Sequence, residues 1–421
     1  MKVLVVGSGG REHAICWALK KSPKVTELYC APGNGGISEI ATCVDVKATD
    51  IPGMVAWAKE NRMDFVIVAP DDPLAMGMVD ALEEAGIRAF GPRKNAAIIE
   101  GSKAFSKELM KKYGIPTAAY EIFTDKDAAL SYVEAQGAPI VVKCDGLALG
   151  KGVIVAQTVE EAKAAVISMM EDKAFGDAGA KVVIEECMVG PEVTVLAFTD
   201  GKTIIPMPSS QDHKRAYDGD KGPNTGGMGA ISPCPNYTSE HAKICMDTIF
   251  LPTVKALNAE GRTFQGVIYF GMMLTAKGPK VVEYNARFGD PECQAVLSLL
   301  ETDLMDILEA CVDGTLDNVH VKFKDAASCC LVLASGGYPV AYEKGKEISG
   351  LDAVRDAVVF HAGTKLDGGK FYTNGGRVLG VTAVAPDLKA AVDKAYQAAK
   401  PVSFEKMHFR RDIGYHILDA K

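Results

Sequence analysis

The sequence has no long basic tract, no apolar run of membrane length and no C-x-x-C pair. Its 46 lysines and arginines are mixed along the chain with 54 aspartates and glutamates, which gives a net charge of −8. Binding to nucleic acid relies on clustered positive charge, which this pattern does not supply. The longest apolar runs, such as residues 329–334, have only the length of a strand, whereas a membrane helix needs about 20 residues. Nucleic acid and membrane are therefore not expected as partners.

The 11 cysteines are scattered, mostly among apolar residues. This distribution is typical of reduced core residues rather than of disulfides or a metal site. The first residues, MKVLVVGSGG, lead directly into a predicted strand and a glycine turn, without the apolar stretch and small-residue cleavage site of an export signal. We therefore expect a cytoplasmic protein.

A length of 421 residues predicts several packed units. Residues 1–101 alternate strand-like and helix-like segments, which indicates a doubly wound parallel sheet of the α/β class. A helix is expected over residues 100–113. After it, residues up to 325 contain short strands joined by glycine turns, typical of an antiparallel α+β unit. Residues 326–421 have their own strands and a helix, and form a third, small α+β unit.

The stretch VLVVGSGGREH joins a predicted strand to a predicted helix, as in a dinucleotide-binding turn. However, Glu12 stands at the third glycine position of that pattern, and the second strand ends in C-A-P, with no acid to hold a ribose. A nicotinamide-dependent dehydrogenase is therefore disfavoured. A helix N-terminus beside Arg11 suits a single phosphate, and a tight turn without a ligand fits the motif equally well.

A second glycine loop lies in KCDGLALGKGVIVA, where Lys143 ends one strand and another strand follows Gly152. Glycines such as Gly146 and Gly150 expose backbone N–H groups to phosphate oxygens, and the lysine adds positive charge. No helix-starting G-K-[ST] follows, so this is not the Walker pattern. The loop fits a lid over a triphosphate, and an ordinary glycine hairpin fits it comparably well.

The stretch VVIEECMVGPEVTV combines two strands with three acids. Backbone groups of Glu186 and Met188 fit the edge of an adenine, and Glu192 fits ribose hydroxyls. A solvated hairpin explains the same residues without any ligand.

The stretch VVEYNARFGDPE places polar residues on alternate positions at the end of an apolar strand. Glu283, Asn285 and Arg287 would share one face, because residues two apart on a strand point to the same side. Two oxygen ligands suit Mg²⁺, and a guanidinium suits a developing phosphoryl charge. A buried ladder of salt bridges is the alternative reading.

Residues 209–230 form a polar, glycine-rich loop that is too long for a simple turn. Its acid and cations, Asp212, His213, Lys214 and Arg215, suit a phosphorylated or carboxylate substrate. A solvated run of charges is again the alternative, although the flanking apolar strands make it less favoured.

Taken together, these motifs resemble the phosphoribosylamine–glycine ligase family, the glycinamide ribonucleotide synthetases of the ATP-grasp superfamily. The stretches that carry the resemblance run in order along the chain and include GSGGREHA, PGNGG, GSKAFSK, VKCDGLALGKGV, QDHKRAYDGDKGPNTGGMGA, EYNARFGDPE, GGYP, HAGT, TNGGRVLGVTA and FRRDIGY. QDHKRA and ARFGDPE are specific to this ligase family within the superfamily.

The resemblance implies that glycine and 5-phosphoribosylamine are joined at the expense of ATP, through glycyl phosphate, with Mg²⁺ or Mn²⁺ as the metal, in purine synthesis. It implies an ATP-grasp fold over residues 102–325, with a lid lobe at about 120–188, in a monomer. The residues that it implies for ATP are Lys103, Lys143, Gly146, Gly150, Glu185, Glu186, Met188 and Glu192. Those for the substrates are Gly9, Gly10, Arg11, Asp212, His213, Lys214, Arg215, Gly226 and Asp290. Glu283 and Asn285 match the metal ligands, and Arg287 matches the catalytic arginine.

Two positions depart from the expected pattern. Many ATP-grasp enzymes have another metal-binding acid where this chain has Gly271, and the first unit has Asp71 where a glutamate is usual. A different ATP-dependent carboxylate–amine ligase, and a nucleotide-binding protein without activity, are the rival readings. The second is opposed by Arg287, because simple binding does not need a residue directed at a transferring phosphate.

Overall fold

The computed structural model describes residues 1–148 and 152–418 of the chain. The strands of the first unit are β1 (Lys2–Gly7), β2 (Glu27–Pro32), β3 (Thr42–Cys43), β4 (Phe65–Val68) and β5 (Arg88–Phe90). They form a parallel sheet in the order β3-β2-β1-β4-β5, as the sequence predicts. The helices of this unit are α1 (Gly10–Leu19), α2 (Ile51–Glu60), α3 (Asp71–Met76), α4 (Met78–Glu84) and α5 (Lys94–Gly101).

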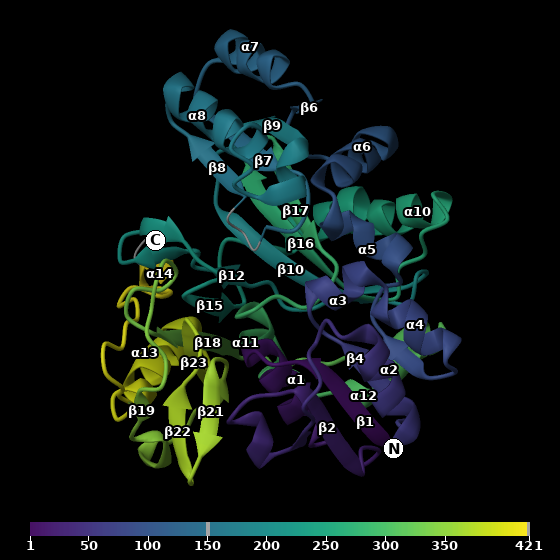
Figure 1. Cartoon of the computed structure of the whole chain (residues 1–421), viewed down its shortest axis with the longest axis vertical. Helices are drawn as coiled ribbons and strands as arrows, with labels where there is room; N and C mark the ends of the chain where they lie inside the picture. The colour runs from purple at the N-terminus through teal and green to yellow at the C-terminus, as the bar shows by residue number, and fades with distance from the viewer. Residues whose placement is uncertain (149–151, 419–421) are drawn as a thin grey trace.

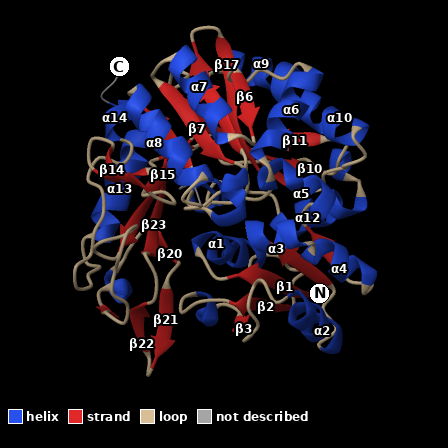
Figure 2. Cartoon of the chain, turned by 45° about the horizontal axis from the view of Figure 1, so that its top comes forward, coloured by secondary structure: helices blue, strands red, loops and turns tan. Residues whose placement is uncertain are grey.

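Alternate residues of β1 pack on opposite faces of this sheet, and helices cover both faces (Figure 2). Leu4 and Val6 share a core with Met54 of α2, whereas Val5 shares another core with Ile15 of α1. Burial on both faces explains the continuous apolar run in β1. Because β1 and β2 are parallel, the turns after them meet at one edge of the sheet.

The helix expected over residues 100–113 is wrong at its start. Helix α5 ends at Gly101, and a separate helix, α6 (Lys103–Tyr113), begins after Ser102. Ser102 has an extended backbone, and its hydroxyl accepts a hydrogen bond from Phe105 N at 3.0 Å. This N-cap ends one helix and begins the next, and it places Lys103 in the first turn of α6.

The lid lobe lies at the top of Figure 1. Its strands form an antiparallel sheet in the order β6-β9-β7-β8, and its helices pack against each other and on the sheet. Its apolar residues form a core of their own. The elements are β6 (Tyr120–Phe123), α7 (Lys126–Gln136), β7 (Ile140–Cys144), β8 (Val153–Ala156), α8 (Val159–Met170) and β9 (Val182–Glu186).

A second antiparallel sheet, in the order β11-β10-β16-β17, lies below the lobe. Its buried side chains, such as Val195 and Phe270, belong to the same core as Leu4 of the first unit, so the two units share one hydrophobic interior. The elements are β10 (Glu192–Thr199), β11 (Ile204–Pro206), α9 (Ser239–Cys245), α10 (Leu251–Ala259), β16 (Gly266–Thr275), β17 (Gly278–Asn285), α11 (Glu292–Leu297) and α12 (Leu304–Asp313).

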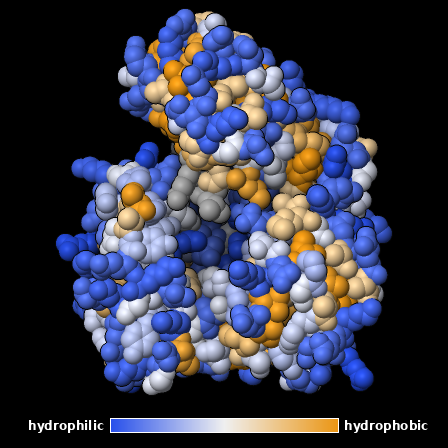
Figure 3. Space-filling model, viewed as in Figure 1, coloured by the Kyte–Doolittle hydropathy of each residue, from blue (hydrophilic) through white to orange (hydrophobic). Residues whose placement is uncertain are grey.

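The third unit is built on an antiparallel sheet in the order β12-β15-β18-β23-β20, packed against α13. Two of its strands come from residues 211–232, before residue 326, so the predicted limits do not separate this sheet from the preceding unit. The elements are β12 (Gln211–Asp212), β13 (Arg215–Tyr217), β14 (Lys221–Asn224), β15 (Gly229–Ser232), β18 (Ala327–Ala334), β19 (Glu347–Ile348), β20 (Val358–His361), β21 (Thr364–Asp367), β22 (Lys370–Thr373), β23 (Arg377–Ala385), α13 (Leu388–Ala399) and α14 (Tyr415–Leu418). Figure 3 shows a hollow with hydrophilic walls between the lid lobe and the two lower units.

Two histidines lie where the first unit meets the third. His13 of α1 and His361 of β20 are 6% and 4% exposed. His361 N donates a hydrogen bond to His13 Nδ1 at 2.7 Å, and His361 Nδ1 lies 3.0 Å from Thr364 Oγ1. Burial lowers the pKa of His13 to about 3 and the pKa of His361 to about 4. Both imidazoles are therefore neutral near pH 7.

We expect the free energy of unfolding to fall as the pH drops below about 6.5. An unfolded histidine binds a proton near that pH, whereas folded His13 and His361 stay neutral almost down to their lowered pKa values. Each histidine should then remove up to about 1.4 kcal/mol per pH unit. Urea unfolding between pH 8 and pH 5 measures this slope. His361→Gln should reduce it, and His320→Gln, at an exposed position, should not; an unchanged slope in the His361 variant would contradict the assignment.

Candidate active site

Strand β17 carries two residues of the polar row that the sequence predicts, and the third, Arg287, follows the end of the strand. Glu283 and Asn285 lie on β17, and Gly271 of β16 is paired with Glu283. A Cβ atom at residue 271 would lie 3.0 Å from Glu283 Cγ. The glycine therefore leaves the space that the Glu283 side chain occupies, which is a steric reason for the absence of an acid there.

Glu283 lies in a strongly positive environment. Its Oε1 is 3.4 Å from Lys214 Nζ. Burial alone would raise the pKa of Glu283, but Lys214, Lys143, Lys103 and Arg287 outweigh burial and lower it. Glu283 is therefore ionised at neutral pH, and the excess of cations around it suits a polyphosphate.

Arg287 is held by an acid from the end of α5. Arg287 Nη2 lies 2.9 Å from Glu100 Oε1, and Glu100 Oε2 accepts a hydrogen bond from Ala286 N at 2.7 Å. The Asn285 amide also faces Glu100. Assigned with its nitrogen toward this carboxylate, it donates to Glu100 Oε1 at 2.9 Å, and the amide oxygen is left for another partner. Arg287 Nε is buried and has no hydrogen-bond partner within residues 1–148 and 152–418. The guanidinium thus keeps one buried N–H available.

Lys143 reaches the same region from the lid lobe. It is the penultimate residue of β7, and its Nζ donates to Val282 O of β17 at 3.2 Å. The same ammonium lies 3.0 Å from Glu185 Oε2 on the neighbouring strand β9. Lys143 therefore bridges the lid lobe and the strand that carries Glu283.

Lys103 holds the start of the second glycine loop. Its Nζ donates to Gly146 O at 2.8 Å, and Gly146 has φ +112°, a conformation that favours glycine. Asp145 Oδ1 accepts hydrogen bonds from Ser102 Oγ and Ala104 N, each at 3.1 Å. The start of α6 and the start of the loop are thus tied together, whereas the predicted phosphate-binding residue Gly150 lies outside the described residues.

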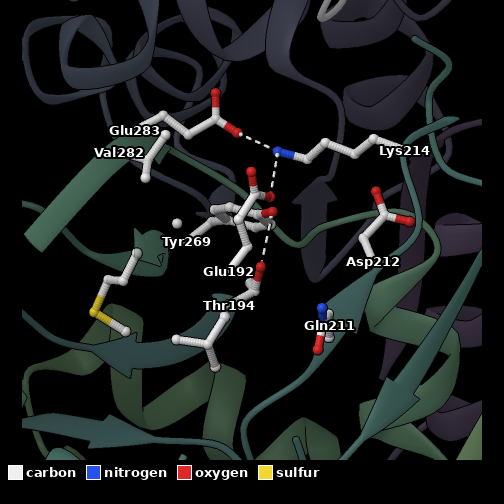
Figure 4. Close-up of a pocket in the computed structure, with 11 residues that line it drawn as sticks. Glu192, Thr194, Gln211, Asp212, Lys214, Tyr269, Val282 and Glu283 are labelled. Atoms are coloured by element: carbon white, nitrogen blue, oxygen red, sulfur yellow. Dashed lines mark hydrogen bonds and ion pairs between the residues drawn. The ribbon is translucent and has the colours of Figure 1, made fainter. Parts of the chain in front are cut away.

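Lys214 projects into a small pocket between β10, β12, β16 and β17 (Figure 4). Its Nζ lies 3.7 Å from Glu192 Oε2, in addition to the contact with Glu283. Two other side chains of the pocket are joined by a hydrogen bond from Thr194 Oγ1 to Tyr269 OH at 2.9 Å. The pocket therefore combines carboxylates, hydroxyls and one ammonium around a polar space.

The family models decide what kind of site this is. The model described as the phosphoribosylglycinamide synthetase ATP-grasp (A) domain matches residues 101–293. The N-domain and C-domain models of the same synthetase match residues 1–100 and 328–416. The chain belongs to the phosphoribosylglycinamide synthetase family. The resemblance drawn from the motifs is thereby confirmed, and the chain is a ligase with an ATP-grasp fold.

Curated members of the synthetase family match this chain almost from end to end. The phosphoribosylamine–glycine ligase of Halalkalibacterium halodurans is 51% identical over 98% of this chain and 96% of its own length. The enzyme of the same name from Vibrio vulnificus is 50% identical over 99% of both chains. A crystal structure of phosphoribosylamine–glycine ligase from Thermotoga maritima superposes with a TM-score of 0.85, at 32% identity, over 98% of this chain and all of that chain.

More distant structures resemble this chain in fold only. The biotin carboxylase domain of the Hydrogenobacter thermophilus 2-oxoglutarate carboxylase, in complex with MgADP, has a TM-score of 0.73 at 18% identity. It covers 96% of this chain and is itself covered to 91%. The three-unit architecture is therefore shared with other ATP-grasp proteins, while family membership rests on the higher identities.

In this synthetase-family chain, the first glycine turn is closed by carboxylates. Gly9 N donates to Glu12 Oε2, and Arg11 Nε to Glu12 Oε1, both at 2.7 Å. Arg11 N donates to Asp290 Oδ2 at 3.2 Å. A Cβ atom at Gly7 would lie 2.5 Å from Glu12 Cγ, so this glycine makes room for the carboxylate. Glu12 thus fills the position where a dinucleotide turn has its third glycine.

Asp290 connects this turn to the third unit. Gln294 Nε2 donates to Asp290 Oδ1 at 2.9 Å, and Arg377 Nη1 lies 3.5 Å from the same oxygen. Arg377 also donates to Gly226 O at 2.8 Å, and a Cβ atom at Gly10 would lie 2.4 Å from Gln294 Nε2. The predicted substrate residues Gly226 and Asp290 therefore meet at Arg377 of β23, and Gly10 lies against Gln294, the hydrogen-bond partner of Asp290.

The loop predicted to bind substrate divides into two sets. Asp212 and Lys214 line the pocket. The ring nitrogens of His213 instead face backbone groups of residues 229 and 414, each at 3.1 Å, and the side chain is buried. Arg215 donates to a backbone carbonyl of β14 at 2.9 Å. Asp212 and Lys214 are thus brought to the pocket, while His213 and Arg215 brace the loop.

The residues predicted for adenine and ribose lie at the end of β9, in the connection that follows it and at the start of β10. The Glu186 carboxylate accepts from Ala119 N at 3.0 Å and lies 3.3 Å from Lys280 Nζ. Met188 follows β9 and is half-buried, and Glu192 begins β10 with its side chain 50% exposed. The Glu186 side chain is thus engaged by the protein, and so is its backbone N–H, which donates to Ala119 O at 2.9 Å.

Four residues of this region were not predicted from the sequence: Glu100, Lys107, Tyr269 and Arg377. Lys107 had a usable signal, because it stands one helical turn after Lys103 on α6. Arg377 lies in a motif that carries the family resemblance, but with no role assigned to it. Glu100 and Tyr269 had no local signal.

None of the helices within residues 1–148 and 152–418 is long and apolar enough to cross a membrane.

Proposed function

We propose that this chain joins glycine to 5-phosphoribosylamine, converting ATP to ADP and phosphate and forming glycinamide ribonucleotide, as a step of purine synthesis. Relatives named phosphoribosylamine–glycine ligase, about 50% identical over nearly the whole chain, support this proposal. The observation that carries the proposal is the environment of Glu283, an ionised carboxylate acted on by three lysines and by Arg287. Such a site suits a triphosphate whose γ-phosphoryl group is transferred.

The nucleotide would lie between the lid lobe and the sheet of β10, β16 and β17. Lys103 and Lys143 would contact its phosphates, and the loop after Lys143 would cover them. Backbone groups near Glu185, Glu186 and Met188 would hold adenine, and Glu192 would accept hydrogen bonds from ribose hydroxyls.

The residues on β17 fit a divalent ion. Glu283 is ionised, and the Asn285 amide, assigned with its nitrogen toward Glu100, directs its oxygen away from that carboxylate. Two protein oxygens together with nucleotide phosphates match the preference of Mg²⁺, and Mn²⁺ accepts the same donors. When bound, such an ion neutralises phosphate charge and orients the triphosphate. No cluster of three or more histidine, cysteine or acidic residues suited to a metal occurs in the part of the chain that the structure describes, so most other ligands would come from the nucleotide.

The chemistry then needs positioning and charge neutralisation rather than a covalent enzyme intermediate. The glycine carboxylate attacks the γ-phosphorus, and ADP leaves. Arg287, which has a free buried Nε, would donate to the transferring phosphoryl oxygens. The amine of phosphoribosylamine attacks the carbonyl carbon of glycyl phosphate, loses a proton and releases phosphate. The lid lobe would exclude water from this labile acyl phosphate.

The substrates would occupy the two polar regions next to the nucleotide. Asp212 and Lys214, in the pocket, suit the ammonium and carboxylate of glycine. The turn at Gly9, Gly10 and Arg11, with Gly226 and Asp290, suits phosphoribosylamine. His213 and Arg215 would act by bracing the loop that carries Asp212 and Lys214.

We also infer that the chain works as a monomer in the cytoplasm. All the residues assigned to the site come from one chain, so no second copy is needed to complete it. All 11 cysteines are free, as is usual in a reducing compartment.

An assay of ADP release tests the proposal. Release is expected only when glycine and 5-phosphoribosylamine are both present, with glycinamide ribonucleotide as the second product detected by mass spectrometry. Release with glycine and a different amine would identify another ATP-dependent ligase. Release that needs neither substrate would contradict the proposed function.

A further inference from the structure

Lys107 is a buried cation that the proposed mechanism does not use. It lies on α6, and its side chain is 3% exposed. Its Nζ donates to Thr117 Oγ1 at 2.7 Å, and Thr117 Oγ1 donates to Val281 O of β17 at 2.7 Å. A buried ammonium is costly unless it is paired, so its presence needs an explanation.

The acidic partner of Lys107 is the carboxylate that also binds Lys143. Lys107 Nζ lies 3.2 Å from Glu185 Oε1, and Lys143 Nζ lies 3.0 Å from Glu185 Oε2. The Glu185 side chain is itself 3% exposed. One carboxylate is thus shared between two ammonium groups, and the three side chains together carry a net charge of +1.

This sharing affects how strongly Lys143 can attract a phosphate. If Glu185 had Lys143 as its sole cation, the two would form a neutral buried pair, and the pair would have to break before Lys143 could move to a ligand. With Lys107 on the other oxygen, Glu185 stays compensated when Lys143 turns away. Breaking a buried pair by removing one partner is otherwise strongly unfavourable.

We propose that Lys107 is a positioning residue that balances Glu185 and thereby leaves Lys143 free to bind nucleotide phosphates. This inference rests on the proposed nucleotide site, but not on which carboxylate and amine are joined. Lys107 also connects three elements, because it lies on α6, pairs with β9 of the lid lobe and reaches β17 through Thr117.

The protonation of Lys107 depends on this pairing. The pKa of Lys107 is lowered to about 8, because burial and the nearby Lys143 together outweigh Glu185, which raises it. The ammonium therefore keeps its charge near pH 7 because Glu185 is beside it. The charge of each group therefore depends on the charge of the other, as expected for interacting titratable groups.

The test is a double-mutant cycle read by calorimetric binding of ADP and adenosine to the full-length chain. Lys107→Met should weaken ADP binding by about 10-fold. Glu185→Gln removes the charge that needs balancing, so adding Lys107→Met to Glu185→Gln should change ADP affinity by less than about threefold. Adenosine has no phosphate, and its affinity should be the same in the wild type and in Lys107→Met.

Controls separate this role from a purely structural one. Lys111→Met, at an exposed position of α6, should bind ADP like the wild type. Lys107→Gln serves in place of Lys107→Met should that variant fail to fold. In the ligase assay, Lys107→Met should raise the KM for ATP and leave the KM for glycine unchanged.

The outcomes are distinct. The inference is overturned by wild-type ADP affinity in the Lys107 variants, or by an equal loss with and without Glu185→Gln. It is also overturned by a parallel loss of adenosine binding, because that would mean a collapsed site. Failure of the wild-type chain to bind ADP would instead overturn the proposed nucleotide site.

Discussion

Replacing Arg287 with alanine should lower kcat by about 100- to 1,000-fold, with a smaller change in the KM for ATP. The guanidinium is anchored on Glu100 at 2.9 Å and keeps a buried, unpaired Nε within the described chain. A donor held in this way is pre-organised for charge that develops during transfer, and its loss is felt in the transition state more than in binding. Steady-state ADP release with both substrates present measures the effect.

The Arg287 variant needs a control for folding, because it leaves Glu100 buried without its cation. Burial already raises the pKa of Glu100, and Arg287 opposes that rise. In the alanine variant Glu100 should therefore take up a proton more readily and become neutral. The double variant Arg287→Met/Glu100→Gln removes both charges at once, and it should match the wild type in Tm and the single variant in kcat. A kcat within about threefold of the wild type in either variant would exclude Arg287 from the transition state.

The fold followed from local patterns where one pattern dominated. The parallel sheet was predictable because the strands alternate with helices, and the apolar run of β1 is buried on both faces. The boundary between α5 and α6 was not predictable. Residues 100–113 have the pattern of one helix, and only the structure shows that Ser102 is the N-cap of α6. Likewise β15 joins the sheet of the third unit by pairing with β18, which is distant in sequence, and β12 joins it by pairing with β15.

The site shows the same division between local and distant information. The row of Glu283, Asn285 and Arg287 was visible because a strand repeats every two residues. Its partner Glu100 was not, because it contacts Ala286 across 186 residues of sequence. The loop with Asp212 and Lys214 was correctly seen as polar, but which side chains line the pocket depends on how β12 and β13 are placed. The exact contacts of an acid such as Asp290 follow from packing between units, which no local pattern contains.

Replacing Glu283 with glutamine should lower metal affinity in the presence of ADP by at least about 10-fold and reduce turnover correspondingly. Glutamine keeps the shape of the side chain but removes the charge that makes Glu283 a ligand. The measurements are calorimetric titration of Mn²⁺ into the ADP complex and the Mg²⁺ dependence of ADP release. Glu301→Gln, at an exposed position, is the matched control and should leave both unchanged.

The same Glu283 variant makes a second, opposite prediction that separates a metal ligand from a general loss of structure. Glu283 lies among Lys214, Lys143, Lys103 and Arg287 and offsets part of their charge. Without it, the site is more positive, so ADP in the absence of divalent ions should bind at least as tightly as to the wild type. A collapsed site would weaken ADP binding under both conditions. Weaker binding of metal-free ADP, or an unchanged requirement for Mg²⁺, would therefore contradict the assignment of Glu283 as the metal-binding carboxylate.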